Sequence, residues 1–178
     1  MIRKIVLILA LCLLIATPAM AQNKIAVADL VLITATSDAG KSAEQQLQSL
    51  FGNEKNQLEA QANTLNQKVE ELQRQAAAMS EQALNTRSQE IQRMAQELDQ
   101  KSAAYGQRLG RVQQAISSQM QEIVMTACSD FASKNGYDMI LDTSGLLFAV
   151  NALDVTQALT AEVNRIWKSR GSKFTIPN

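Results

Sequence analysis

The most regular pattern of hydrophobic and polar positions runs along residues 41–134, in the middle of the chain. Apolar residues recur there every seven positions, and several have a second apolar residue three positions ahead. The first half contains Phe51, Leu58, Ala62, Leu65, Val69, Leu72, Ala76 and Met79, and the second half contains Leu84, Ile91, Leu98, Tyr105, Leu109, Val112, Ile116 and Ile123. A heptad series of this kind forms the seam between packed helices. The pattern therefore predicts two long helices that pack against each other.

The two halves of the pattern meet near residues 76–86, where we expect the chain to reverse. Residues 41–134 contain no proline and residues 53–105 contain no glycine, and strong helix formers dominate both halves. One unbroken helix of this length would be exceptional, and Ser80 is a suitable N-cap for a returning helix. The sequence predicts a helical hairpin over residues 41–134 with its tip at 76–86.

Small residues make the predicted seam thin. Alanine or serine occupies positions where a rigid coiled coil would carry leucine or isoleucine, namely Ala62, Ala76, Ser88, Ala95 and Ser102. Gly106 and Gly110, in the returning helix, each cost about 1 kcal/mol relative to alanine. We therefore predict helices that bend, with Gly106 and Gly110 as the hinge.

Shorter patterns on both sides of the hairpin predict a small β-sheet. Residues 24–33 are rich in aliphatic and β-branched side chains, which predicts a strand that leads into a turn at 34–40. Residues 137–142 and 146–150 are predicted to form a β-hairpin around a turn at 143–145.

The two ends of the chain are predicted to meet in one β-body, because the helical hairpin returns the chain to its starting point. This body comprises residues 22–40 and 135–169, and it includes a last helix that Asp154 caps. Residues 170–178 are predicted to be a flexible tail. A few short strands and one helix make a marginal core, so association with further copies is expected. The candidate contacts between copies are Ile25, Val27, Ile140, Leu141, Leu147 and Phe148.

Residues 1–21 have the pattern of a secretory signal peptide. Arg3 and Lys4 precede an apolar run over residues 5–16, and small residues stand before a cleavage point after Ala21. The run is shorter than the roughly 20 residues that cross a bilayer as a helix. The sequence predicts an exported chain that begins at Gln22.

Composition argues against catalysis and nucleic-acid binding. The chain has 17 basic and 17 acidic residues, and removal of Arg3 and Lys4 leaves 15 basic residues and a net charge of −2. There is thus no basic field for nucleic acid. Histidine, the commonest general base and metal ligand, is absent from the sequence. Residues 39–42 end like a phosphate-binding loop, but Ala35 stands where that loop needs glycine. We expect no enzyme activity, catalytic residue, cofactor or metal site.

Five short blocks flank the predicted hairpin and carry a resemblance to a known family. They are KIAVADL at 24–30, SDAGK at 37–41, GYDMILD at 136–142, GLLFA at 145–149 and LDVT at 153–156. With the heptads between them, they resemble the Skp/OmpH family of periplasmic chaperones over essentially the whole mature chain. The resemblance implies an α+β fold, with a long antiparallel helical hairpin as a coiled-coil arm on a small β-sheet body. It also implies a homotrimer, in which three arms hang like jellyfish tentacles around a central cavity.

The same resemblance implies an ATP-independent periplasmic holdase that binds unfolded outer-membrane proteins and prevents their aggregation. Met79, Leu84 and Met94 near the tip are candidate client contacts, and each is as well suited to closing the seam. Family members often have basic arms, whereas glutamates match the arginines near this tip. Contact with membrane or lipopolysaccharide therefore stays open.

A structural coiled-coil spacer or scaffold of the cell envelope is the alternative function, because heptads fit both. A scaffold is expected to have a tightly packed aliphatic seam. Alanine and serine thin the seam of this chain, which favours the holdase.

Overall fold

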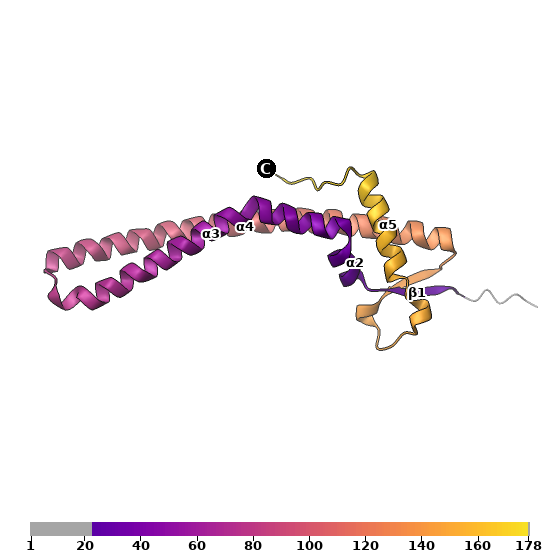
Figure 1. Ribbon diagram of the computed structural model, residues 1–178, viewed down its shortest axis with the longest axis horizontal. Coiled ribbons are helices and arrows are strands. Elements are labelled where there is room, and N and C mark those ends of the chain that lie inside the picture. The colour runs from indigo at the N-terminus through magenta and orange to yellow at the C-terminus, as the bar shows by residue number, and fades with distance from the viewer. Residues whose placement is uncertain (1–22, 178) are drawn as a thin grey trace, which may run out of the picture.

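The computed structural model describes residues 23–177, and the predicted signal peptide lies outside the described residues. Two long helices, α3 (Asp38–Gln75) and α4 (Glu81–Asn135), run antiparallel and form an arm that projects from a small body (Figure 1). At about 1.5 Å per residue, the 38 residues of α3 span about 57 Å. The predicted α+β fold, a long helical hairpin on a small sheet, is confirmed.

The chain reverses at the tip of the arm over residues 76–80. Helix α3 runs into a short 3-10 turn, η1 (Ala76–Ala78), and Met79 is extended. Ser80 then caps α4, because its Oγ accepts a hydrogen bond from the Ala83 amide at 3.3 Å. The reversal is therefore set by local sequence at the position where the sequence predicts it.

The first strand is shorter than the sequence predicts. Strand β1 covers only Ile25–Ala28, and the prediction of a strand over residues 24–33 is wrong beyond that point. Helix α2 (Leu30–Thr36) follows at once, because the Asp29 carboxylate accepts a hydrogen bond from the Leu32 amide at 2.8 Å. This N-cap outweighs the β propensity of the aliphatic residues that follow it.

The predicted turn at residues 34–40 is also helical. Ser37 ends α2 and caps α3, and its Oγ accepts a hydrogen bond from the Gly40 amide at 3.2 Å. A Cβ atom at Gly40 would lie 1.7 Å from the carbonyl oxygen of Thr34. Glycine is thus what permits the close approach of α2 and α3.

The body contains a two-stranded sheet in which β1 pairs with β2 (Met139–Asp142) in parallel. Ile25 lies opposite Met139, and Ala28 lies opposite Asp142. Parallel neighbours need a long crossover connection, and the whole arm serves as that connection. The sheet therefore joins the two ends of the arm at its base.

The predicted β-hairpin over residues 137–150 lacks its second strand. After β2 the chain enters a 3-10 turn, η2 (Thr143–Gly145), in which the Asp142 carboxylate accepts a hydrogen bond from the Ser144 amide at 3.3 Å. This turn directs the chain away from β2, and residues 146–150 pair with no strand in the described part of the chain. A further 3-10 turn, η3 (Asn151–Leu153), leads to the last helix.

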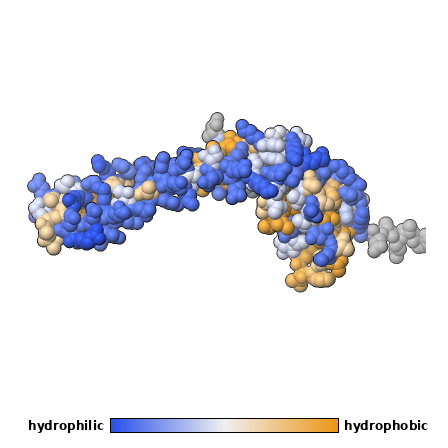
Figure 2. Space-filling model, viewed as in Figure 1, coloured by the Kyte–Doolittle hydropathy of each residue, from blue (hydrophilic) through white to orange (hydrophobic). Residues whose placement is uncertain are grey.

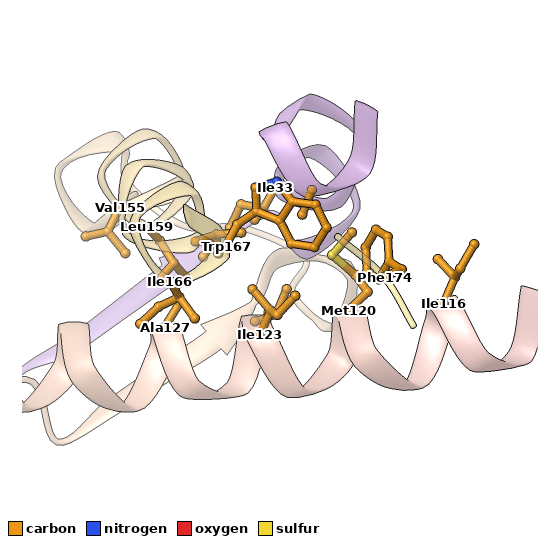
Figure 3. Packing of buried hydrophobic residues seen from close by; sticks show 14 of the residues in the cluster. Ile33, Ile116, Met120, Ile123, Ala127, Val155, Leu159, Ile166, Trp167 and Phe174 are labelled. Atoms are coloured by element: carbon orange, nitrogen blue, oxygen red, sulfur yellow. The ribbon is translucent and has the colours of Figure 1, made fainter. Parts of the chain in front are cut away.

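The hydrophobic core lies where helix α5 (Thr156–Ser169) crosses the body end of α4 (Figure 3). The predicted apolar face of α5 is buried there. The predicted cap is off by one residue, because the N-cap is Val155, which makes no side-chain cap hydrogen bond. Asp154 stands just before it and accepts a hydrogen bond from the Thr156 amide at 2.8 Å. The buried core residues from these two helices are Val112, Ile116, Met120, Ile123, Val124, Ala127, Leu159, Val163, Ile166 and Trp167. The arm is therefore anchored through the second half of α4.

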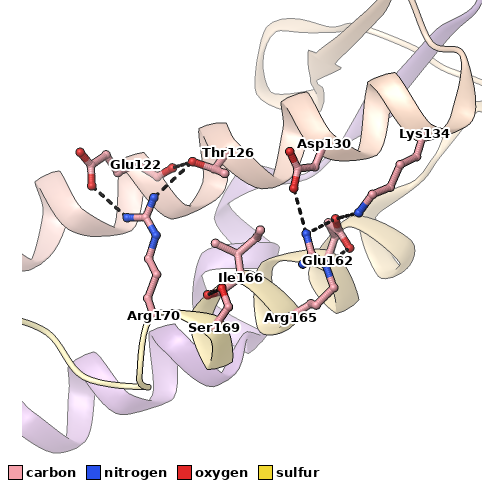
Figure 4. Close-up of polar contacts among 9 residues, drawn as sticks. All are labelled: Glu122, Thr126, Asp130, Lys134, Glu162, Arg165, Ile166, Ser169 and Arg170. Atoms are coloured by element: carbon pink, nitrogen blue, oxygen red, sulfur yellow. Dashed lines mark hydrogen bonds and ion pairs between the residues drawn. The ribbon is translucent and has the colours of Figure 1, made fainter.

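Ion pairs flank this crossing (Figure 4). Glu162 on α5 accepts hydrogen bonds from Arg165 and from Lys134 on α4, which together lower the pKa of its carboxyl from 4.5 to about 2. Arg165 also reaches Asp130 at 2.8 Å. These contacts bridge α5 to α4 beside the buried apolar core.

The predicted flexible tail is wrong for the described residues 170–177. Phe174 is buried at 1% exposure, and its ring centroid lies 4.6 Å from that of Trp167. Gln119 on α4 makes two hydrogen bonds to the backbone of Thr175. The segment docks because an aromatic residue follows a turn at the end of α5, and the sequence reasoning overlooked that residue.

Candidate functional site

The arm has a long apolar seam that stays partly open to solvent. No residue from 52 to 111 is fully buried, although this range contains most of the heptad series. A pair of helices covers each seam residue from one side only, and alanine or serine at alternating positions leaves further surface uncovered. Figure 2 shows a mainly hydrophilic arm with less polar patches toward its tip.

The three candidate contact residues all lie on this part of the arm. Met79 sits in the reversal at the tip, and Leu84 and Met94 lie on the first turns of α4. Each side chain is half-buried, so each packs in the seam and also presents surface to solvent. The geometry is compatible with both of the predicted roles.

Polar bridges between α3 and α4 hold the outer arm in register. Lys68 Nζ lies 2.7 Å from Glu90 Oε1, and this hydrogen bond is the main cause of the lowered pKa of Glu90. Further bridges join Arg87 to Gln75, Lys101 to Gln61 and Arg108 to Glu54. Exposed pairs of this kind contribute about 0–1 kcal/mol each. The arm is therefore held by contacts that are individually weak.

The inner arm is packed more firmly than the outer arm. The rings of Phe51 and Tyr105 meet edge to face with their centroids 5.8 Å apart, and Phe51 is buried. Gly106 and Gly110 follow on α4, both are exposed, and apart from the neighbouring backbone of α4 itself no atom lies within 4 Å of a Cβ placed on either. They lie at the border between the anchored and the open part of the arm, and their action as a hinge stays a prediction.

An apolar groove at the base of the arm was missed by the sequence reasoning. It has a volume of about 660 Å³ and lies between α2, α3 and α4. Its apolar lining includes Leu30, Ala43, Leu47, Ile116, Met120 and Val124. The groove depends on α2 being a helix. Because the sequence pattern predicted a strand over these residues, the groove could not be expected from it.

The residues predicted to join copies of the chain fall into two groups. Leu147 and Phe148 project from the body with exposures of 108% and 83%, and Ile25 is 37% exposed. Ile140 and Leu141 are half-buried. Val27 is 3% exposed in the chain's own core, so its prediction as an interface residue is wrong. Its side chain faces the segment over residues 143–151, with which it lines a small cavity, and its carbonyl accepts a hydrogen bond from the Val155 amide at 2.9 Å.

Comparison with known proteins identifies the family. A family model described as "Outer membrane protein (OmpH-like)" matches residues 24–163. The chain belongs to this family. The resemblance seen in the flanking sequence blocks is thereby confirmed, and the OmpH-like family is not an enzyme family.

OmpH-like relatives match this chain over most of the length of both proteins. A protein named Chaperone protein Skp from Pectobacterium atrosepticum is 24% identical over 155 residues, which cover 87% of this chain and 94% of the relative. Another of that name, from Photorhabdus luminescens, is 24% identical over 145 residues, covering 82% and 88%.

A solved structure agrees in fold. The crystal structure of an OmpH-like outer membrane chaperone from Caulobacter crescentus CB15 superposes with a TM-score of 0.64 at 16% identity, covering 89% of this chain and 91% of that one. At this identity the likeness concerns the fold. The docked segment 170–177 lies beyond the residues that the OmpH-like family model matches. None of the helices in the described part of the chain has an apolar stretch that could span a membrane.

Proposed function

We propose that this OmpH-like chain is an ATP-independent periplasmic chaperone that holds unfolded outer-membrane proteins and prevents their aggregation. The observation that carries this proposal is the open seam of the arm, where no residue from 52 to 111 is fully buried. Half-exposed Leu, Met and Ala side chains offer many weak apolar contacts and match no single partner closely. The strand segments of outer-membrane proteins alternate apolar and polar residues, so an unfolded one offers apolar side chains that such a surface can contact at many points.

The proposed working form is a homotrimer joined through the bodies. A two-stranded sheet is marginal on its own, and an open sheet edge tends to pair with another strand. Apolar side chains gather on the body beside this sheet, and Figure 2 shows them as an orange region at the end of the molecule away from the arm. The exposed residues are Ile25, Met139, Leu147, Phe148, Val150 and Leu153. Burial of these residues between copies would leave the three arms free to surround a client.

The charge distribution on the arm favours enclosure of clients over their electrostatic capture. Arginines on the outer arm have acidic neighbours, as in the pairs Arg74–Glu70 and Arg93–Glu97. We therefore expect client binding to depend weakly on salt concentration. A steep salt dependence would instead favour binding of acidic clients, lipid or lipopolysaccharide.

Aggregation of a denatured outer-membrane porin tests the proposed function against the scaffold alternative. The porin is diluted from urea into buffer without nucleotide, and light scattering is followed with increasing amounts of the mature chain. A holdase abolishes the scattering at near-stoichiometric amounts. An envelope spacer leaves the scattering unchanged, and that result would refute the proposal.

A matched pair of variants connects the assay to the seam. Leu84→Ser together with Met94→Ser makes the outer seam polar, and the expected result is weaker suppression of aggregation. Asn85→Ser with Gln92→Ser changes exposed polar positions on the same turns of α4 and serves as the control. Equal suppression by both double variants would place client binding elsewhere on the molecule.

A further inference from the structure

The segment after α5 lies on the side of α4 as an extended peptide would. The chain turns through Gly171 and Ser172, both with positive φ, and then runs extended. Phe174 is buried and Ile176 is half-buried, whereas Lys173 and Thr175 between and beside them are exposed. Figure 3 shows the Phe174 ring beside Trp167, close to Met120 and Ile116 of α4. Alternate side chains of the segment thus enter an apolar slot.

Gln119 recognises the backbone of this segment. The Thr175 amide donates to Gln119 Oε1 at 2.9 Å, and Gln119 Nε2 donates to the Thr175 carbonyl at 2.8 Å. Nε2 also donates to the Ala115 carbonyl at 3.0 Å, which orients the amide group. A residue of a neighbouring β-strand would satisfy the same pair of backbone groups. The contact is therefore independent of the side chain at this position.

We propose that this slot, formed by Ile116, Gln119, Met120 and Trp167, is a binding site for extended peptides. Its ligand carries an aromatic side chain, then any residue, then an aliphatic side chain, and the chain's own residues 173–177 are the resident occupant. A strand of an unfolded outer-membrane protein has this alternation and displaces the resident segment. The identity of the displacing client rests on the proposed function, whereas the peptide site does not.

Tethering explains why the slot is filled at rest. The short connection through Gly171 and Ser172 gives the resident segment an effective concentration on the order of millimolar or above. Against this concentration, a single free peptide competes poorly. A client with many suitable strands, held by the arm, competes at a similarly high local concentration. The slot is thus expected to open to clients that already occupy the arm.

Phe174→Ser tests the site in the otherwise complete mature chain, because it vacates the slot. The probe is a fluorescently labelled peptide, SKFTIPN, with the sequence of residues 172–178, and its binding is followed by polarisation. The peptide is expected to bind the variant at least about tenfold more tightly than the unchanged chain, in which the tether competes. Adding Gln119→Leu to the variant is expected to weaken binding about tenfold, since two backbone hydrogen bonds are lost. Equal binding to the variant and the unchanged chain, or no binding to either, would overturn the site.

The control peptide is SKTFIPN, which has the same composition but loses the alternation. It is expected not to bind, and equal binding of the two peptides contradicts the proposed recognition. If Phe174→Ser unfolds the body, Ile176→Ser vacates only the outer half of the slot and permits the same comparison. Denatured porin is then expected to release the bound peptide from the variant. If the porin fails to release the peptide, unfolded outer-membrane proteins are not ligands of this slot. The porin aggregation assay tests the proposed chaperone function separately.

Discussion

Replacing Leu159 with alanine tests whether the stability of the molecule resides in the body. Leu159 is fully buried in the core between α5 and its neighbours. Truncation of a buried leucine to alanine costs about 2–5 kcal/mol, and a site with no exposure belongs in the middle of that range or above. Leu65→Ala is the matched change in the arm, where the side chain is half-exposed. Its expected cost is about 1–2 kcal/mol, confined to the arm.

Urea unfolding followed by tryptophan fluorescence separates the two outcomes. Trp167 is the only tryptophan of the chain and lies in the body core, so its emission reports on the body alone. With an m-value of about 2 kcal/mol/M, a loss of about 3 kcal/mol lowers the midpoint for Leu159→Ala by about 1.5 M. Leu65→Ala is expected to leave this midpoint unchanged while increasing hydrogen exchange in the arm. All samples need one protein concentration, because the proposed association would contribute to stability. Equal midpoint shifts for both variants would show that arm and body unfold as one unit and would refute the reasoning.

Three further predictions concern pH, bending and assembly. The pKa of Glu162 is lowered from 4.5 to about 2 in the folded state, so its contribution to stability is complete above pH 4.5 and is lost as the pH falls toward 2. Glu162→Gln is expected to flatten the fall in melting temperature over that range, and an unchanged profile contradicts this. Gly106→Ala with Gly110→Ala is expected to slow hydrogen exchange in the outer arm, since each glycine costs about 1 kcal/mol in a helix, and unchanged exchange rejects the hinge. If the chain forms the proposed trimer, Phe148→Asp is expected to shift it to monomers in sedimentation velocity with unchanged circular dichroism; a variant that assembles as the unchanged chain does would exclude this residue from the interface.

The helical hairpin was predictable because its causes are local. Heptad spacing, the absence of proline and the capping side chain at Ser80 act within a few residues of one another, and all are visible in the sequence. The same is true of the apolar face of α5. These features depend on residues close together in the sequence, not on how distant parts of the chain fold.

Most of the errors arise where distant segments decide the structure, and one also overlooks a local cap. Residues 30–33 have strand-like composition, but the Asp29 cap and packing against α5 make them a helix. Residues 146–150 also have strand-like composition, yet no partner strand is available within the described chain. Phe174 seemed to belong to a loose end, because nothing local shows that Trp167 and α4 form a slot for it. Val27 has the residue type of an interface position, and only the fold shows that its own chain covers it.

Photo-crosslinking from defined positions measures most directly whether the open seam of the arm holds unfolded protein. A photoreactive residue is placed in turn at Met79, Leu84 and Met94 on the arm and, as a control, at exposed Ser133 on the body end of α4. Denatured porin is added and the samples are irradiated. Crosslinks to the porin from the three arm positions and none from Ser133 are the expected result. Crosslinks from Ser133 with none from the arm would contradict the proposal that the arm binds clients.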